Sequence, residues 1–285
     1  MSENAKTGWR ADSGLPARIK TAAFLAPLVV IGVLFLPSQW FAAAFGFVLC
    51  FALWEWTRII GFRLRRLRGV IVGANAALIG VLWLYTPEHW LMPIVYAGAV
   101  WWCLALVWLR AFDFASAPTR KNKDLKVIVG SVVVVPAWVA AWLLHKEPEQ
   151  GPWWTLFVLV LIWIADAAAY FAGRRFGQHK LAPRISPGKT LEGLYGALLG
   201  AVVYAAAVGA WLNPSWTAYF CFVLLVTVTV LFSVVGDLFE SLIKRHSNIK
   251  DSGTIFPGHG GMLDRIDSVL AALPIFAAGR SLFGL

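Results

Sequence analysis

Repeated apolar segments, each about 20 residues long, constrain the fold of this chain more than any other feature. A helix of that length crosses the hydrocarbon core of a bilayer, where backbone groups find no water and must pair within their own segment. Nine such segments are present, at 19–36, 39–57, 69–86, 90–109, 126–144, 153–173, 190–212, 216–238 and 267–283. The sequence therefore predicts an all-α fold, a polytopic transmembrane helical bundle of about nine spans.

Composition excludes an ordinary soluble domain. Of the 285 residues, 59% are hydrophobic and only 14% are charged, whereas soluble domains carry about 25% charged residues. We expect a single integral membrane domain over 1–285, in which helices of 1–150 precede the motif-bearing helices of 151–285. The three cysteines lie inside apolar segments without metal-ligand spacing, so neither disulfides nor a zinc site is indicated.

The distribution of Lys and Arg predicts the orientation in the membrane. Of the 25 basic residues, 23 lie in five segments, which are the amino-terminal tail and the loops 58–68, 110–126, 174–189 and 244–265. The loops between them contain only Lys146. The positive-inside rule places the basic segments, including the amino terminus, in the cytoplasm. We therefore expect a multi-pass protein of the cell (inner) membrane, with no nucleic-acid partner despite the net charge of +10.

Acidic residues also occur within or beside the apolar segments. Each costs about 2.5–3.5 kcal/mol at the centre of a membrane helix, so each needs a physical reason. The four are Glu55, Asp166, Glu192 and Asp237, all toward the predicted cytoplasmic end. For Glu55 we expect an ion pair with Arg58, three residues on. For Asp166 and Asp237 we expect a functional role, and the four together indicate a shared polar cavity that opens to the cytoplasm.

The stretch 236–268 concentrates polar residues on two predicted helix ends. If the helix over 216–238 continues, one face carries Asp237, Glu240, Ser241 and Lys244. A second helix that begins near Leu263 would carry Asp264, Asp267 and Ser268 on one face. These carboxylates suit Mg²⁺, which takes oxygen ligands and leaves positions for water and substrate phosphate. Two polar faces are thus expected to meet at one membrane surface.

Basic and glycine-rich residues surround these carboxylates. Lys244, Arg245, Lys250 and Arg265 offer positive charge for phosphate oxygens. The segment 257–261, Pro-Gly-His-Gly-Gly, can present successive N–H groups at a helix amino terminus, which is an anion-binding arrangement. Singly, each feature has a simpler interpretation as a turn, a solvated ion pair or a capping histidine.

Taken in order, these residues resemble the signature of the phosphatidate cytidylyltransferase family, also called CDP-diacylglycerol synthases. The signature reads Ser, two residues on Lys-Arg, four residues on Lys-Asp, then His-Gly-Gly, two residues, Asp-Arg, one residue and Asp. Its positions are filled by Ser241, Lys244, Arg245, Lys250, Asp251, His259, Gly260, Gly261, Asp264, Arg265 and Asp267.

A second segment, 186–193, looks like the Ser-Pro-x-Lys-Thr-x-Glu-Gly element of the same family. Its Gly-Lys-Thr could also end a P-loop, but Pro183 stands where that motif requires Gly, and we predict no strand before it. The preceding segment 166–177 is similar to the family's as well, with Ala167 where Thr is more usual. The resemblance is specific over about 160–268.

The resemblance implies a nucleotidyltransferase of phospholipid biosynthesis that converts CTP and phosphatidic acid to CDP-diacylglycerol and pyrophosphate. The catalytic residues it implies are Asp237, Lys244, Lys250, Asp251, Asp264 and Arg265. The substrate-binding residues are Ser186, Lys189, Glu192, Ser241, Arg245, His259, Gly260 and Gly261. Mg²⁺ would be held by Asp237, Asp264 and Asp267. The partners are CTP, phosphatidic acid and membrane lipid, and the sequence also allows a homodimer.

Two other functions compete with this interpretation. A transporter would place its binding groups near the midplane and show paired halves, neither of which is visible here. A CTP-using lipid kinase would transfer the γ-phosphoryl group and release CDP rather than pyrophosphate. The identity of the leaving product separates the two enzymes.

Overall fold

The computed structural model describes residues 15–212, 215–253, 255 and 260–285, with side chains from Ala23 onward. The helices are α1 Leu15–Phe35, α2 Ser38–Ile59, α3 Arg65–Tyr85, the 3₁₀ turn η1 Glu88–Trp90, α4 Leu91–Arg110, α5 Arg120–His145, α6 Gly151–Phe176, α7 Leu191–Leu212, α8 Trp216–His246 and α9 Leu263–Phe283. A hairpin of β1 Lys180–Ala182 and β2 Ser186–Thr190 lies between α6 and α7.

Eight of these helices, α2 to α9, are long and apolar enough to cross a membrane, and α1 adds a shorter apolar stretch, Ala23–Phe35. The prediction of a polytopic helical bundle is therefore confirmed, and each predicted segment falls on one helix. The largest differences in bounds occur at charged ends. There α5 begins at Arg120, α8 continues to His246 and α9 begins at Leu263, because a helix can extend past the apolar core.

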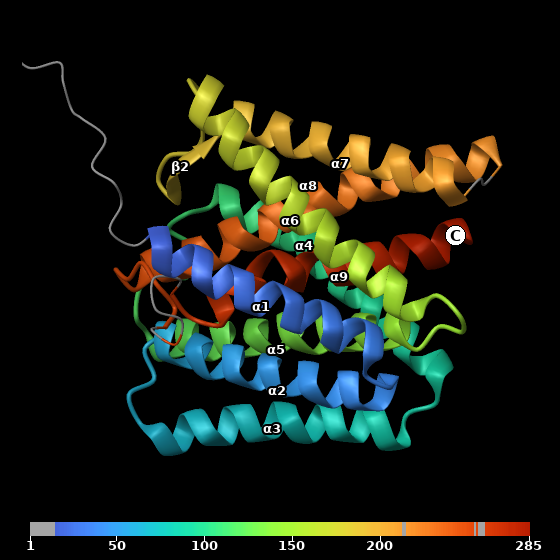
Figure 1. Ribbon diagram of the computed structural model, residues 1–285. Helices are drawn as coiled ribbons and strands as arrows, with labels where there is room; N and C mark the ends of the chain where they lie inside the picture. Colours follow the sequence, from blue (N-terminus) through green and yellow to red (C-terminus); the bar gives the residue numbers. More distant parts are fainter. Residues whose placement is uncertain (1–14, 213–214, 254, 256–259) are drawn as a thin grey trace, which may run out of the picture.

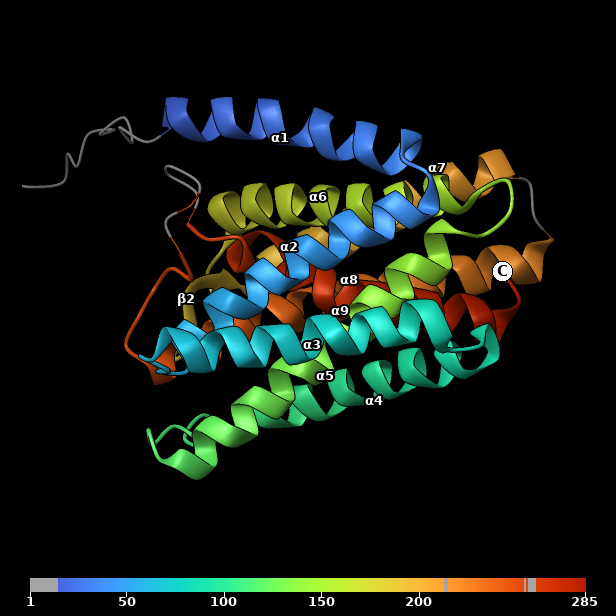
Figure 2. The same ribbon diagram turned by 90° about the horizontal axis from the view of Figure 1, so that it is seen from below.

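The bundle is centred on α5 and α9 (Figure 1). In their apolar windows 72% and 61% of residues are buried, against 22% for α3, which lies at one edge. The last helix contacts α4, α5 and α8, so helices from both halves of the chain surround it. Figure 2 shows α1 as the outermost helix, over α6 and α2.

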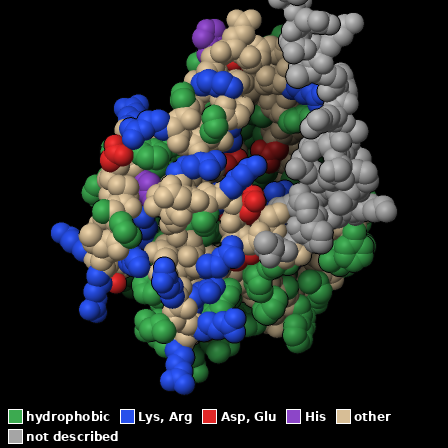
Figure 3. Space-filling view, turned by 90° about the vertical axis from the view of Figure 1, so that its left-hand side faces the viewer, with side chains coloured by type: hydrophobic (Ala, Val, Ile, Leu, Met, Phe, Trp, Pro, Cys, Tyr) green, Lys and Arg blue, Asp and Glu red, His purple; other side chains and the backbone are tan. Residues whose placement is uncertain are grey.

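All the described basic loops lie at one end of the bundle. The carboxyl ends of α2, α4, α6 and α8 and the β-hairpin gather there, and the carboxyl terminus of the chain lies at the other end (Figure 1). Figure 3 looks onto this basic end and shows Lys and Arg side chains around a recess that contains acidic side chains. The alternation of loops predicted from charge is thus present, while its cytoplasmic orientation stays a prediction.

The β-hairpin was not predicted from the sequence. Its two strands are antiparallel, with Lys180 opposite Thr190 and Ala182 opposite Ser186. Strands this short, in a basic loop, lack the alternating pattern that identifies longer strands. A strand therefore does precede Pro183, contrary to our expectation. The P-loop interpretation still fails, because Gly188 and Lys189 lie on β2 of a hairpin rather than in a phosphate-binding turn.

Small residues allow α6 and α7 to approach closely. A Cβ added to Gly200 would lie 3.0 Å from Cβ of Ala168, and one added to Gly196 would lie 2.9 Å from the Ala168 carbonyl oxygen. Membrane helices lack a hydrophobic drive to associate in lipid, so close backbone packing of this kind holds them together. The site-bearing hairpin that joins α6 to α7 depends on this contact.

We predict that Gly196→Leu lowers the free energy of unfolding by about 1–3 kcal/mol, because the new side chain overpacks the α6–α7 contact. The measurement is the thermal unfolding midpoint of purified protein in detergent. Gly73→Leu is the matched control, since a Cβ there meets nothing within 4 Å. Equal midpoints for the two variants would contradict the close contact.

Candidate active site

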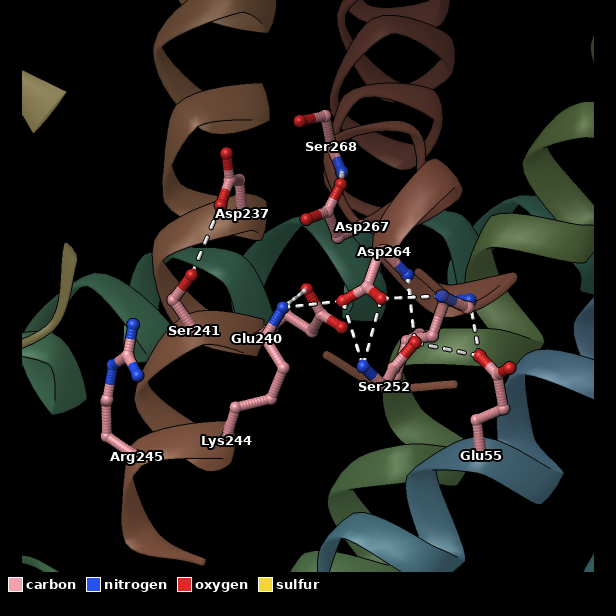
Figure 4. Close-up of polar contacts among 12 residues, drawn as sticks. Glu55, Asp237, Glu240, Ser241, Lys244, Arg245, Ser252, Asp264, Asp267 and Ser268 are labelled. Carbon is pink, nitrogen blue, oxygen red and sulfur yellow. Dashed lines mark hydrogen bonds and ion pairs between the residues drawn. The ribbon is translucent and has the colours of Figure 1, made fainter. Parts of the chain in front are cut away.

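The polar faces of α8 and α9 meet, as the sequence predicted. Nζ of Lys244 lies 2.6 Å from Oδ1 of Asp264 and 2.8 Å from Oε2 of Glu240 (Figure 4). Both Lys244 and Glu240 are buried. One turn earlier on α8, Ser241 donates a hydrogen bond to Oδ1 of Asp237 at 3.3 Å. The lysine therefore links the two helices through a buried ion-pair network.

The Asp264 carboxylate also holds the segment between α8 and α9. Besides Lys244, it accepts hydrogen bonds at Oδ2 from the backbone N–H groups of Ser252, at 2.9 Å, and Gly261, at 2.7 Å. Gly260 has a φ of 77°, in the left-handed region that favours glycine. Both carboxylate oxygens thus have partners within the protein, and Asp264 fixes the turn that begins α9.

Glu55 reaches this segment from α2. Its Oε2 accepts hydrogen bonds from Oγ of Ser252 and from the backbone N–H of Leu263, each at 2.8 Å. Arg58 donates to the Ser252 carbonyl oxygen rather than pairing with Glu55. The expected Glu55–Arg58 pair is therefore wrong. A carboxylate is favoured at the first turn of α9, where N–H groups point at it.

Glycines leave the space that Glu55 occupies. A Cβ added to Gly253 or to Gly261 would collide with Glu55 oxygens. The carboxylate is almost fully buried, and its Oε1 has no hydrogen-bond partner among the described residues. The sequence signal for this role was an acid inside an apolar segment, whereas nothing distinguished Ser252 from an ordinary loop serine.

The β-hairpin brings a second cation to α8. Nζ of Lys189, on β2, lies 2.6 Å from Oδ2 of Asp237. Arg245 fixes the hairpin by donating from Nε to the Ile185 carbonyl oxygen, just before Ser186. Glu192 accepts hydrogen bonds from the backbone N–H of Gln178 and from His179. Glu192 therefore closes the base of the hairpin.

A cavity of about 860 Å³ connects this site with the membrane-spanning part of the bundle. Its charged end is lined by Asp166, Asp237, Asp264, Arg265, Asp267 and Ser268, and apart from Thr155 the rest of its wall is apolar. The expected shared cavity is thus found for Asp166 and Asp237. For Glu55 and Glu192 that expectation is wrong, because they serve as anchors for α9 and the hairpin.

The predicted metal ligands lie at this cavity, on α8 and α9. Among the described residues no group of three His, Cys, Asp or Glu is gathered closely enough to hold a metal ion. Asp264 is already bonded through both oxygens, whereas Asp237 and Asp267 face the cavity from two helices (Figure 4). Mg²⁺ is commonly bound by one or two carboxylates plus substrate phosphates. The metal assignment stays a prediction.

The remaining predicted residues are less enclosed. Lys250 and Asp251 are exposed on the segment before Ser252, and Arg265 is exposed at the mouth of the cavity. The Gly261 N–H is taken up by Asp264, so it is not free in this arrangement to bind a substrate anion. His259 lies outside the described residues.

The fold and the cavity define a multi-pass membrane protein with a charged site at one end of its helices. Over residues 16–283 the chain matches the family model described as the cytidylyltransferase family. The chain therefore belongs to this family, and it is a nucleotidyltransferase.

Two of the relatives cover nearly the whole chain, and a third covers less than half of it. It is 38% identical to the phosphatidate cytidylyltransferase of Pseudomonas aeruginosa over 264 residues, which are 93% of this chain and 96% of that protein. It is 35% identical to the Haemophilus influenzae protein of the same name over 281 residues, 92% of this chain and 97% of the relative. A Thermotoga maritima phosphatidate cytidylyltransferase is 42% identical over 124 residues, 42% of this chain and 46% of that protein.

We predict that Glu55→Ala lowers the free energy of unfolding by about 2–4 kcal/mol, because Ser252 Oγ and the Leu263 N–H lose their acceptor in a buried place. The measurement is again the thermal midpoint in detergent. Glu88→Ala, which removes an exposed carboxylate paired with Lys146, is the matched control and is expected to change little. A midpoint for Glu55→Ala equal to that of the control would show that Glu55 does not anchor α9.

Proposed function

We propose that this protein transfers a cytidylyl group from CTP to phosphatidate, giving CDP-diacylglycerol and pyrophosphate, in phospholipid biosynthesis. The observation that carries the proposal is one cavity with a charged end and apolar walls. Phosphatidate has the same two parts, a phosphate headgroup and acyl chains. The family match and the names of the full-length relatives support the same reaction.

The chemistry requires charge neutralisation more than proton transfer. A phosphatidate phosphate oxygen attacks the α-phosphorus of CTP, the bond from that phosphorus to the bridging oxygen of the β-phosphate breaks, and pyrophosphate leaves with the electron pair. The attacking oxygen is already ionised at neutral pH, so no strong base is needed. Bringing two anions together is the obstacle, and positioned cations lower it.

Three cationic side chains near the cavity support this proposal. Arg265 stands at the mouth of the cavity, and Lys189 reaches Asp237 from the hairpin. Lys250 is exposed on the nearby loop. We propose that Arg265 and Lys189 contact substrate phosphates, with Lys250 assisting. Lys244, bonded to Glu240 and Asp264, keeps the two helices in register so that these groups face one another.

We assign Mg²⁺ to Asp237 and Asp267, with Asp264 holding the turn beside them. When bound, Mg²⁺ would offset the phosphate charge and orient the nucleotide. Further contacts to substrate stay predictions from the family resemblance, and so does a homodimer. The residues predicted to make these contacts are Asp251, Ser186, Glu192, Ser241, Arg245, His259, Gly260 and Gly261.

We further propose that the protein lies in the inner membrane with this site on the cytoplasmic side. CTP is a soluble cytoplasmic nucleotide, and the basic end of the bundle is where the cavity's charged residues lie (Figure 3). The positive-inside rule favours the same orientation. Phosphatidate would reach the site from the adjoining leaflet.

The test is to incubate the purified protein with CTP and phosphatidate, with and without Mg²⁺, to analyse the lipid by mass, and to measure released pyrophosphate and CDP. We predict CDP-diacylglycerol and pyrophosphate only with Mg²⁺ present. We predict that Asp237→Asn and Asp267→Asn each lower turnover by roughly a hundredfold or more, the scale expected when an electrostatic group at the transition state is lost.

Asp124→Asn is the control, because Asp124 is an exposed acid on α5 that pairs only loosely with Arg120, at 3.9 Å. It should keep normal turnover. Release of CDP and no CDP-diacylglycerol would replace the proposal with a lipid kinase. Normal turnover in Asp237→Asn and Asp267→Asn would remove the assignment of the cation to these two carboxylates.

A further inference from the structure

We propose that the start of α3, with the loop before it, is a docking surface for anionic phospholipid headgroups. The surface consists of Arg63, Arg65 and Arg66 together with the apolar side chains of Leu64 and Leu67. These residues lie outside the lining of the cavity. The inference is therefore independent of the proposed reaction, because it concerns lipids of the surrounding leaflet rather than the substrate in the site.

The side-chain charge in this segment has one sign. Residues 58–68 contain five arginines and no acidic residue, and the first turn of α3 has no acidic side chain. Clusters of about four to eight basic residues directly beside a membrane helix attract anionic lipids, because such lipids give the leaflet surface a negative potential. An anionic headgroup that approaches this end of α3 therefore meets only positive side-chain charge within the segment.

Two of the five arginines bind within the protein and hold the segment in shape. Arg58 donates to the Ser252 carbonyl oxygen. Arg68 is buried, with its guanidinium carbon 3.9 Å from the centre of the Trp54 ring. It donates to the Trp54 carbonyl oxygen at 2.8 Å and to Oγ1 of Thr57 at 3.2 Å. The first turn of α3 is thereby fixed against the end of α2.

The other three arginines face outward. Arg63, Arg65 and Arg66 are exposed, and none has an ion pair or a side-chain hydrogen bond within the part of the chain that the structure describes. Figure 3 shows basic side chains beside hydrophobic ones at the lower edge of the basic end, the side on which α3 lies in Figure 1. A guanidinium group matches phosphate oxygens with two parallel hydrogen bonds. These three side chains are therefore available to lipid phosphates.

Apolar side chains beside the arginines set the depth of this surface in the membrane. Leu64, Leu67 and Val70 are 66%, 47% and 67% exposed. They face lipid, because α3 lies at the edge of the bundle with only 22% of its apolar window buried. Val70 follows Arg66 by four residues, roughly 6 Å along the helix. The arginines thus lie at the level of the lipid phosphates while the apolar side chains reach the acyl chains.

The lack of acidic residues favours a lipid with net negative charge over a zwitterionic one. Phosphatidylcholine also offers a phosphate, but its choline cation lies beside that phosphate and is repelled by the arginines. No carboxylate within 58–68 could bind the choline. A lipid such as phosphatidylglycerol has the phosphate without the cation. The surface is therefore expected to select anionic lipids from a mixed leaflet.

The experiment uses phosphatidylcholine nanodiscs with a minor fraction of phosphatidylglycerol that carries a photoreactive diazirine close to its headgroup, and it maps adducts by mass spectrometry. Wild-type protein should give adducts within residues 62–70. The test variant combines Arg65→Gln with Arg66→Gln. The control combines Arg175→Gln with Lys180→Gln, so each variant removes two exposed charges from the basic end. A basic residue near an anionic leaflet contributes about fivefold in binding, so the test variant should lose roughly tenfold or more of these adducts.

The control variant should keep the adducts within residues 62–70. Equal adduct yields in the test and control variants would overturn the proposal. So would equal labelling of wild-type protein by a phosphatidylcholine probe with the same diazirine.

A further measurement needs no variant. Salt at 1 M shortens the screening length to about 3 Å, so labelling of residues 62–70 by the phosphatidylglycerol probe should fall in wild-type protein. Labelling that does not respond to salt would show apolar contact alone and would overturn electrostatic docking.

Discussion

The carboxylate of Asp264 is the interaction on which the rest of the site depends. It joins three segments, which are Lys244 of α8, the backbone at Ser252 and the turn at Gly261. A buried charge is tolerated only when it is paired and hydrogen-bonded, and both carboxylate oxygens of Asp264 have partners. With that junction formed, Asp237 on α8 and Asp267 on α9 face one cavity. Asp264 therefore holds the site together and also lines the cavity.

The amino-terminal half contributes to the same site through α1 and α2. Glu55 accepts a hydrogen bond from the N–H of Leu263 at the start of α9, and Arg58 donates one to the Ser252 carbonyl oxygen. The end of α2 therefore holds the segment between α8 and α9 in place. The helix α1 covers the apolar part of the cavity. The half of the chain without these sequence motifs therefore supports the α8–α9 segment and covers the apolar part of the cavity.

The sequence predicted the helices well because the bilayer permits few alternatives, and long apolar segments with charged ends leave little doubt about what spans it. It also placed Asp237, Lys244 and Asp264 near one another, since helical periodicity fixes which residues share a face. It failed where tertiary partners decide. Glu55 had Arg58 one turn away, but the unpaired N–H groups of α9 were a better match. The hairpin of β1 and β2 was missed because three-residue and five-residue strands owe their existence to Glu192 and Arg245 rather than to local pattern.

The acids predicted a shared cavity, and it is found at Asp166 and Asp237, but its apolar walls were beyond sequence reasoning. The sequence predicted that Asp166 lies inside the membrane, but its hydrophobic pattern did not predict that Thr155 and Gly32 line the same cavity. Such spaces arise from how helices cross, and a single sequence carries no direct signal of crossing.

The most direct test of this account is an experimentally determined structure of the protein with phosphatidate and Mg²⁺ in a lipid nanodisc. The account predicts density for the lipid phosphate between Asp237, Asp267 and Arg265, with an acyl chain continuing under α1. A phosphate found at the opposite end of the bundle, near Lys146, or a lipid bound only on the outer surface would contradict it.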